Sequence, residues 1–123
     1  TDKAKDELLI RVNINQKKII VYPNTVRHDF YKDKKMDKDL EKKYSKEFVI
    51  TYVGNTSKRR GLLTVIDSLK IIQKTIPNIK LLIIGKSSFD QVIKDKVKQN
   101  QIEKLVDFIG WIKENDIPNY LLI

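Results

Sequence analysis

The chain contains no cysteine and only one histidine. Disulfides and thiolate metal sites are therefore excluded, and a single imidazole cannot build a metal cluster by itself, so we expect no bound metal. No apolar run approaches the roughly 20 residues that a membrane-spanning helix needs. No signal peptide is visible, which makes a cytoplasmic setting the expectation. The length of 123 residues suits one domain.

The net charge of +9 is large for this length and favours phosphates, nucleic acid or an anionic membrane surface as partners. Its distribution weakens the case for nucleic acid. Much of the charge is lysine interleaved with aspartate and glutamate, as in residues 32–46 (KDKKMDKDLEKKYSK), and alternating signs are typical of a solvated surface. Met36, Leu40 and Tyr44 recur every four residues, which predicts a short helix that docks one apolar stripe.

Residues 48–61 (FVITYVGNTSKRRG) are the most informative stretch of the chain. The β-branched and aromatic run at 49–53 predicts a strand buried on both faces, which Gly54 ends. Beyond the loop at 55–59, apolar residues recur with helical spacing between Leu62 and Ile76. In an open α/β sheet such a loop lies at the carboxyl ends of the strands, where the free N–H groups of a helix start attract anions.

Three consecutive cations close this loop and predict a phosphate pocket. Lys58, Arg59 and Arg60 add full charges to the helix dipole, and arginine offers a planar fork of donors that suits two phosphate oxygens. Gly61 would let the backbone come close to a ligand. The alternative, a merely solvated cationic loop, stays open. The segment matches neither the GxxxxGK phosphate loop nor the GxGxxG dinucleotide fingerprint, so a nucleotide triphosphatase is not expected.

The same pattern of an apolar run that ends at a glycine occurs twice more. Residues 80–85 (KLLIIG) and 105–109 (LVDFI, followed by Gly110) predict two further strands. Strands that alternate with helices at this spacing predict an α/β fold with a parallel sheet and right-handed crossovers. Three strands then end in glycine at the same edge of that sheet.

Two helices complete this pattern. Ser88 and Gln91, three residues apart, predict a capping box for a helix that stops at Asn100. Residues 117–123 predict the start of another short helix. His28, an obvious candidate for acid or base work, lies in a charged segment far in sequence from the cationic loop, and Asp67 is interpreted as a solvent-facing charge on the first crossover helix.

Taken in order, these motifs resemble the C-terminal, donor-binding domain of GT-B glycosyltransferases of the GT4 type (glycosyl transferases group 1). The resemblance covers nearly the whole chain and depends on order and spacing together. Its five motifs are VYPNTV at 21–26, YVGNTSKRRG at 52–61, LLIIG at 81–85, VDFIGW at 106–111 and IPNYL at 117–121.

The resemblance implies a Rossmann-like parallel sheet with flanking helices, as part of an incomplete GT-B C-terminal domain. Residues 1–18 would be an interdomain helix and loop or the end of the acceptor-side domain, and residues 19–123 the N-terminal part of the nucleotide-sugar-binding domain. The family carries a glutamate motif beyond the point that corresponds to Ile123, and the acceptor-side domain is also needed. We therefore expect no catalytic residue in this part and no transfer by it alone.

The implied activity is transfer of a sugar, with retention of configuration, from a nucleotide-diphosphate donor to a glycan or lipid-linked acceptor, without metal or cofactor. The lipid-linked case would suit peripheral attachment to the cytoplasmic membrane face. The resemblance assigns residues to two parts of the donor. The diphosphate would be bound by Gly54, Asn55, Lys58, Arg59, Arg60 and Gly61, and the base would be bordered by Gly110, Trp111 and Ile112.

Three positions depart from the family pattern. Asn55 stands where members usually have arginine, Arg60 where they have lysine, and Thr25 where they have glycine. Arg60 can still bind a diphosphate, whereas Asn55 keeps a donor but loses a charge, for which Lys58 or Arg59 would compensate. Trp111 is open to two interpretations, stacking on a base or packing at the strand end.

Two other classes of function stay open. The first is a basic α/β module that binds nucleic acid or phosphate without transfer chemistry, although residues 55–61 lack the aromatic side chains that a nucleic-acid binder interleaves with its cations. The second is a degenerate glycosyltransferase domain that serves only as a scaffold.

Overall fold

The structure is a computed structural model that describes residues 1–22, 32 and 37–123. The chain divides into two units, Thr1–Phe30 and Tyr31–Ile123. The first unit contains helix α1 (Asp2–Arg11), whose start is capped by the Thr1 hydroxyl, which accepts a hydrogen bond from Ala4 N, and the short turn η1 (Gln16–Lys18). The boundary after Lys18 that the sequence predicts stays a prediction.

The second unit is a three-stranded parallel sheet in the order β1-β2-β3. Its strands are β1 (Phe48–Val53), β2 (Ile79–Ile84) and β3 (Val106–Gly110), and each coincides closely with a predicted apolar run. Helix α3 (Leu62–Ile72) connects β1 to β2, and helix α4 (Asp90–Gln99) connects β2 to β3. This confirms the predicted Rossmann-like α/β fold.

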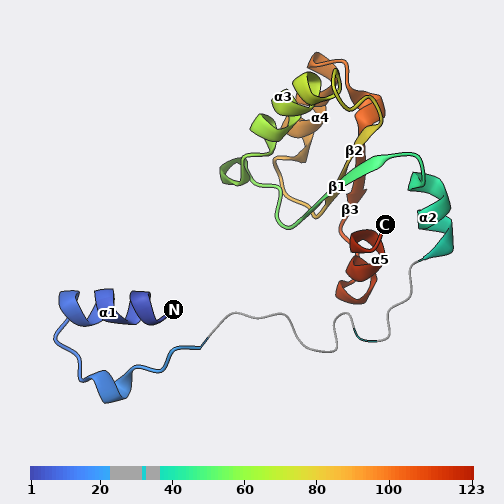
Figure 1. Ribbon diagram of the computed structural model, residues 1–123. Helices are drawn as coiled ribbons and strands as arrows, with labels where there is room; N and C mark the ends of the chain where they lie inside the picture. The colour runs from blue at the N-terminus through green and yellow to red at the C-terminus, as the bar shows by residue number, and fades with distance from the viewer. Residues whose placement is uncertain (23–31, 33–36) are drawn as a thin grey trace. The chain divides into compact units, whose positions relative to one another are not determined.

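Helices α3 and α4 lie side by side on one face of the sheet (Figure 1). Leu62, Ile66 and Leu69 of α3 are buried there because helical periodicity gives them one face, and Ile93 and Val97 of α4 repeat that pattern. Alternate residues of β2 complete this core, which comprises Ile79, Leu81 and Ile83. Burial on both faces explains why residues 81–84 of β2 are a continuous apolar run.

Strand β1 departs from the prediction that it is buried on both faces. Phe48 is 53% exposed and Val53 is 40% exposed, because β1 is the end strand of the described sheet and only β2 pairs with it. Its sequence resembles that of a central strand, but the position of a strand in a sheet is decided by its neighbours.

Two short helices contact the opposite face of the sheet. The Thr51 hydroxyl donates to Tyr120 O of helix α5 (Ile117–Leu121) at 3.2 Å, and the buried Tyr44 of helix α2 (Lys38–Tyr44) donates to Asp107 Oδ2 at 2.8 Å. Both helices were expected from the sequence, and Tyr44 belongs to the predicted apolar stripe. Met36 of that stripe lies outside the described residues.

Asp107 is the centre of a small charged cluster on β3. Lys43 Nζ lies 3.4 Å and Lys80 Nζ 3.5 Å from its carboxylate. Burial alone would raise the pKa of Asp107, but the hydrogen bond from Tyr44 and the two lysine charges outweigh that effect and hold it below its ordinary value. Burial raises the pKa of Tyr44 and so favours the neutral phenol that donates this bond.

The start of α4 differs from the predicted capping box by one residue. Ser87, not Ser88, accepts a hydrogen bond from Phe89 N, and Asp90, not Gln91, accepts in return from Ser87 N. Gln91 instead donates to Asp95 on the surface of the helix. The two serines have the same local propensity, so contacts with the rest of the fold decide between them. The predicted stop at Asn100 is confirmed.

Candidate functional site

The carboxyl ends of the three strands meet closely at one edge of the sheet. Gly54 N donates to Ile84 O at 2.9 Å, and Gly85 N donates to Gly110 O at 2.7 Å. A Cβ atom at Gly85 would lie only 1.8 Å from Gly54 O, and its φ of +137° is one that other residues rarely adopt. Only glycine fits at position 85, so the backbone at this point of the edge is not covered by a side chain of its own.

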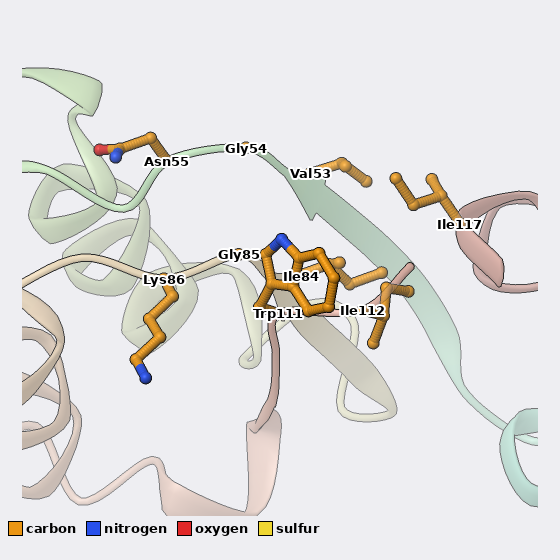
Figure 2. A pocket seen from close by; sticks show the side chains of 9 residues that line it. All are labelled: Val53, Gly54, Asn55, Ile84, Gly85, Lys86, Trp111, Ile112 and Ile117. Atoms are coloured by element: carbon orange, nitrogen blue, oxygen red, sulfur yellow. The ribbon is translucent and has the colours of Figure 1, made fainter. Parts of the chain in front are cut away.

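A hollow of about 340 Å³ opens at this edge, and we call it the sheet-edge hollow (Figure 2). Asn55 and Lys86 lie at its polar end, and Val53 and Ile117 point toward each other at its apolar end. The indole of Trp111 lies between the polar end and the apolar end. Its lining residues are Val53, Gly54, Asn55, Ile84, Gly85, Lys86, Trp111, Ile112 and Ile117.

Trp111 is 72% exposed, so the interpretation that it packs at the strand end is wrong. It follows Gly110, where the pairing of β2 with β3 shifts register so that Gly110 lies opposite Ile84. The indole lines the sheet-edge hollow and also a second hollow of about 470 Å³ on the α4 side, which we call the helix-side hollow. An exposed tryptophan beside a hollow offers a flat apolar face to a ligand.

Lys58, Arg59 and Arg60, which we call the cation triplet, form the short turn η3 (Lys58–Arg60). All three side chains are exposed, and none has an ion-pair partner among the residues that the structure describes. Together with Asn55 and Ser57 they line an open loop hollow of about 650 Å³. Unpaired cations around a concave surface attract anions.

Gly61 connects the cation triplet to α3 in a left-handed conformation, with φ of +74°. A Cβ atom there would meet nothing within 4 Å, so the glycine is needed for its backbone conformation and not for space. No side chain caps the start of α3. The positive end of the dipole of α3 is therefore not neutralised by a side-chain cap, and it would favour an anion bound nearby.

Asn55 shapes the loop. Its backbone oxygen accepts from the Tyr52 hydroxyl at 2.6 Å, and its side-chain Oδ1 accepts from Ser57 N at 2.8 Å. This leaves the Nδ2 group as the donor that a ligand could use.

The comparisons with known proteins assign most of this chain to a family. The family model described as glycosyl transferases group 1 matches residues 33–123, about three quarters of the chain. The chain belongs to the glycosyl transferases group 1. No curated protein matches it. Membership gives the chain a general role in glycosyl transfer, which uses a nucleotide-sugar donor and an acceptor.

The structure divides the predicted donor-binding residues of this group 1 domain between neighbouring hollows. Gly54 and Asn55 share the sheet-edge hollow with Trp111 and Ile112, which were predicted to border the base. Asn55 also lines the loop hollow with the cation triplet. Gly110 lines the helix-side hollow, and Gly61 lines none of the three.

Lys86 is the residue of the site that the sequence analysis missed. It follows Gly85 at the carboxyl end of β2 and lines both the sheet-edge and the helix-side hollows. Its side chain is exposed and has no ion-pair partner within the described part of the chain. A signal was present, because Lys86 follows its strand glycine as Asn55 and Trp111 follow theirs.

Other candidates lie away from the hollows. Asp67 is exposed as expected, but it pairs with Lys96 Nζ at 2.9 Å and accepts from Asn100 Nδ2 at 2.9 Å, and thus connects α3 to α4. These two hydrogen bonds and the nearby lysine charges lower its pKa. His28 and Thr25 lie outside the described residues.

Within residues 1–22, 32 and 37–123, no three histidine, cysteine or acidic side chains gather in a way that could hold a metal ion. In the same ranges, no helix has the length and apolar character that crossing a membrane requires.

Proposed function

We propose that this domain binds the nucleoside diphosphate of a sugar donor at the carboxyl edge of its sheet, as the donor-binding part of a retaining glycosyltransferase of the GT4 type. The observation that carries the proposal is the set of unpaired cations, Lys86 and the cation triplet, around hollows that glycine backbone and one exposed indole also line. Cations suit the diphosphate, and the indole suits a base.

The chemistry of the leaving group explains why cations belong here. When the glycosidic bond of the donor breaks, the nucleoside diphosphate gains negative charge. A cation fixed beside that oxygen stabilises the transition state more than the bound donor, and so raises the rate as well as the affinity. Arg60 is our choice for this role within the cation triplet, because its guanidinium can bind two phosphate oxygens together.

The acceptor is a glycan or a lipid-linked glycan in this proposal. A lipid-linked acceptor would place the enzyme at an anionic membrane surface, and the exposed lysines of α2 and its ends (Lys38, Lys42, Lys43 and Lys46) suit that surface. We expect the complete protein to sediment with anionic vesicles at low salt and to be released as salt rises. Absence of salt-sensitive binding would remove this part of the proposal.

The test is Arg60→Ala in the complete enzyme, assayed with UDP-, GDP- and ADP-sugars by release of the nucleoside diphosphate. A hydrogen bond to a charged group contributes about 1.5 to 3 kcal/mol, so we expect kcat/KM to fall by at least about tenfold. Lys74→Ala is the matched control, because it removes an exposed cation just beyond the C-terminal end of α3. Equal kinetics for the two variants would contradict the assignment of Arg60.

A further inference from the structure

Thr56 is 1% exposed and is the one buried polar residue in the part of the chain that the structure describes. It lies in the loop after β1, between Gly54 and the cation triplet. Its hydroxyl is hydrogen-bonded to Ser87 Oγ at 3.0 Å and, by a short contact, to Asp90 Oδ1. A buried hydroxyl without partners is costly, so this position depends on both contacts.

The chemistry of the three groups fixes the direction of these hydrogen bonds. An ionised carboxylate only accepts, so Thr56 donates its single hydrogen to Asp90, and the Ser87 hydroxyl supplies the hydrogen of the other contact. Asp90 Oδ1 also accepts from Ser87 N at 3.2 Å. We call residues 54–61, between β1 and α3, the β1 loop, and residues 85–89, between β2 and α4, the β2 loop. One carboxylate oxygen thus accepts hydrogen bonds from a side chain of the β1 loop and from the backbone of the β2 loop.

No other side chain of the β1 loop makes such a connection among the described residues. The bonds from the Tyr52 hydroxyl to Asn55 O and from Ser57 N to Asn55 Oδ1 stay within a few residues of one another. Thr56, in contrast, reaches partners 31 and 34 positions further along the chain. The position of the loop that carries the cation triplet therefore depends on Thr56.

We propose that Asp90 is a positioning residue of the donor site, which acts through Thr56 to hold the β1 loop against the β2 loop. The two loops carry the cations on either side of the site: the triplet follows Thr56, and Lys86 precedes Ser87. Holding Thr56 at Asp90 sets the spacing between these cations before a ligand binds, which lowers the cost of ordering them around a diphosphate. The identity of the ligand rests on the proposed function, whereas the connection between the loops does not.

The test compares Thr56→Val, which removes the hydroxyl and keeps the shape, with Tyr44→Phe. Tyr44→Phe is a matched control, because it also removes a hydroxyl that donates a hydrogen bond to an aspartate. That aspartate is Asp107 on β3, not Asp90. Amide hydrogen exchange is measured without ligand at Ser57, Arg60 and Gly61, whose N–H groups are bonded within the loop. The free energy of unfolding of each variant is measured separately by urea unfolding. The exchange rates are then compared after correction for any difference in global stability.

We expect Thr56→Val to accelerate exchange at these three amides by at least about tenfold over Tyr44→Phe. It should also weaken binding of the nucleoside diphosphate that the wild type prefers among UDP, GDP and ADP. Thr56→Ser keeps the hydroxyl and should restore both properties. If Thr56→Val does not fold, Asp90→Asn replaces it, because loss of the carboxylate charge weakens the same bond.

Equal exchange in Thr56→Val and Tyr44→Phe would overturn the proposal, and so would faster exchange with unchanged diphosphate affinity. A wild-type protein that binds none of the three nucleoside diphosphates would contradict the proposed function instead. The exchange comparison would still decide whether Asp90 and Thr56 hold the two loops together.

Discussion

Gly85→Ala is the substitution whose effect follows most directly from the geometry of the strand ends. The new Cβ would lie 1.8 Å from Gly54 O and 2.8 Å from Gly54 C, and both are backbone atoms that cannot rotate away. To reach the 3.0 Å below which real Cβ contacts essentially do not occur, the two strand ends must move about 1.2 Å apart. The hydrogen bond from Gly54 N to Ile84 O holds the ends of β1 and β2 together here, and the bond from Gly85 N to Gly110 O holds the end of β2 to β3, so a shift of Gly85 strains both.

The magnitude follows from what this movement breaks. Each of the two hydrogen bonds contributes about 1 kcal/mol, and a residue held in a sparsely populated backbone region costs about 1 to 3 kcal/mol. We therefore expect Gly85→Ala to lower the free energy of unfolding by about 3 to 5 kcal/mol. A small domain has about 5 to 15 kcal/mol in total, so much of its stability would be lost.

Gly61→Ala is the matched control, because it introduces the same methyl group at a left-handed glycine with nothing within 4 Å. Only the backbone strain applies, and we expect a loss of about 1 to 2 kcal/mol. Urea unfolding followed by far-UV circular dichroism measures both variants, since the exposed Trp111 is a poor fluorescence probe of folding. If Gly85→Ala is no more destabilising than Gly61→Ala, our explanation of the sheet edge is wrong.

Two further predictions concern charge. Lys86→Met keeps the length of the side chain but removes its charge, and we expect it to weaken nucleoside diphosphate binding by about three- to tenfold in a calorimetric titration, with unchanged stability. An unchanged affinity would exclude Lys86 from the site. The lowered pKa of Asp107 means that its contribution to stability is present above the unfolded pKa of about 4 and is lost as pH falls through the folded value. The free energy of unfolding of Asp107→Asn, measured with urea, should thus be lower than that of the wild type at pH 7, and the difference should shrink as pH falls toward 3. A difference in the free energy of unfolding that is independent of pH would contradict the ionic contribution of Asp107.

Much of the fold could be predicted because its signals are local. Residues 81–84 of β2 form one apolar run that ends at a glycine, and the apolar positions of α3 and α4 follow helical spacing. The exposure of β1 could not be predicted, because it depends on which strands flank β1. The choice of Ser87 over Ser88 depends on Asp90 and Thr56, and Thr56 is 31 residues away in sequence.

The site could be predicted less completely. Three adjacent cations before a glycine stand out in any sequence, so the sequence alone predicts the cation triplet as a binding feature. Lys86 is one of 25 lysine and arginine residues, and the one local signal that separates it from solvated ones is its place directly after a strand glycine. Its position beside the sheet-edge hollow comes from the parallel register, which places the residue after Gly85 between the loops that follow Gly54 and Gly110.

The most direct test of the central claim is a titration of this chain with UDP, GDP, ADP and a short single-stranded oligonucleotide at physiological salt, followed by amide chemical shifts. We predict that one nucleoside diphosphate shifts residues 54–61, Lys86 and residues 110–112, and leaves the amino ends of the strands unchanged. Strong oligonucleotide shifts along the lysines of α2 and α4, with no response to the diphosphates, would contradict donor binding at the sheet edge.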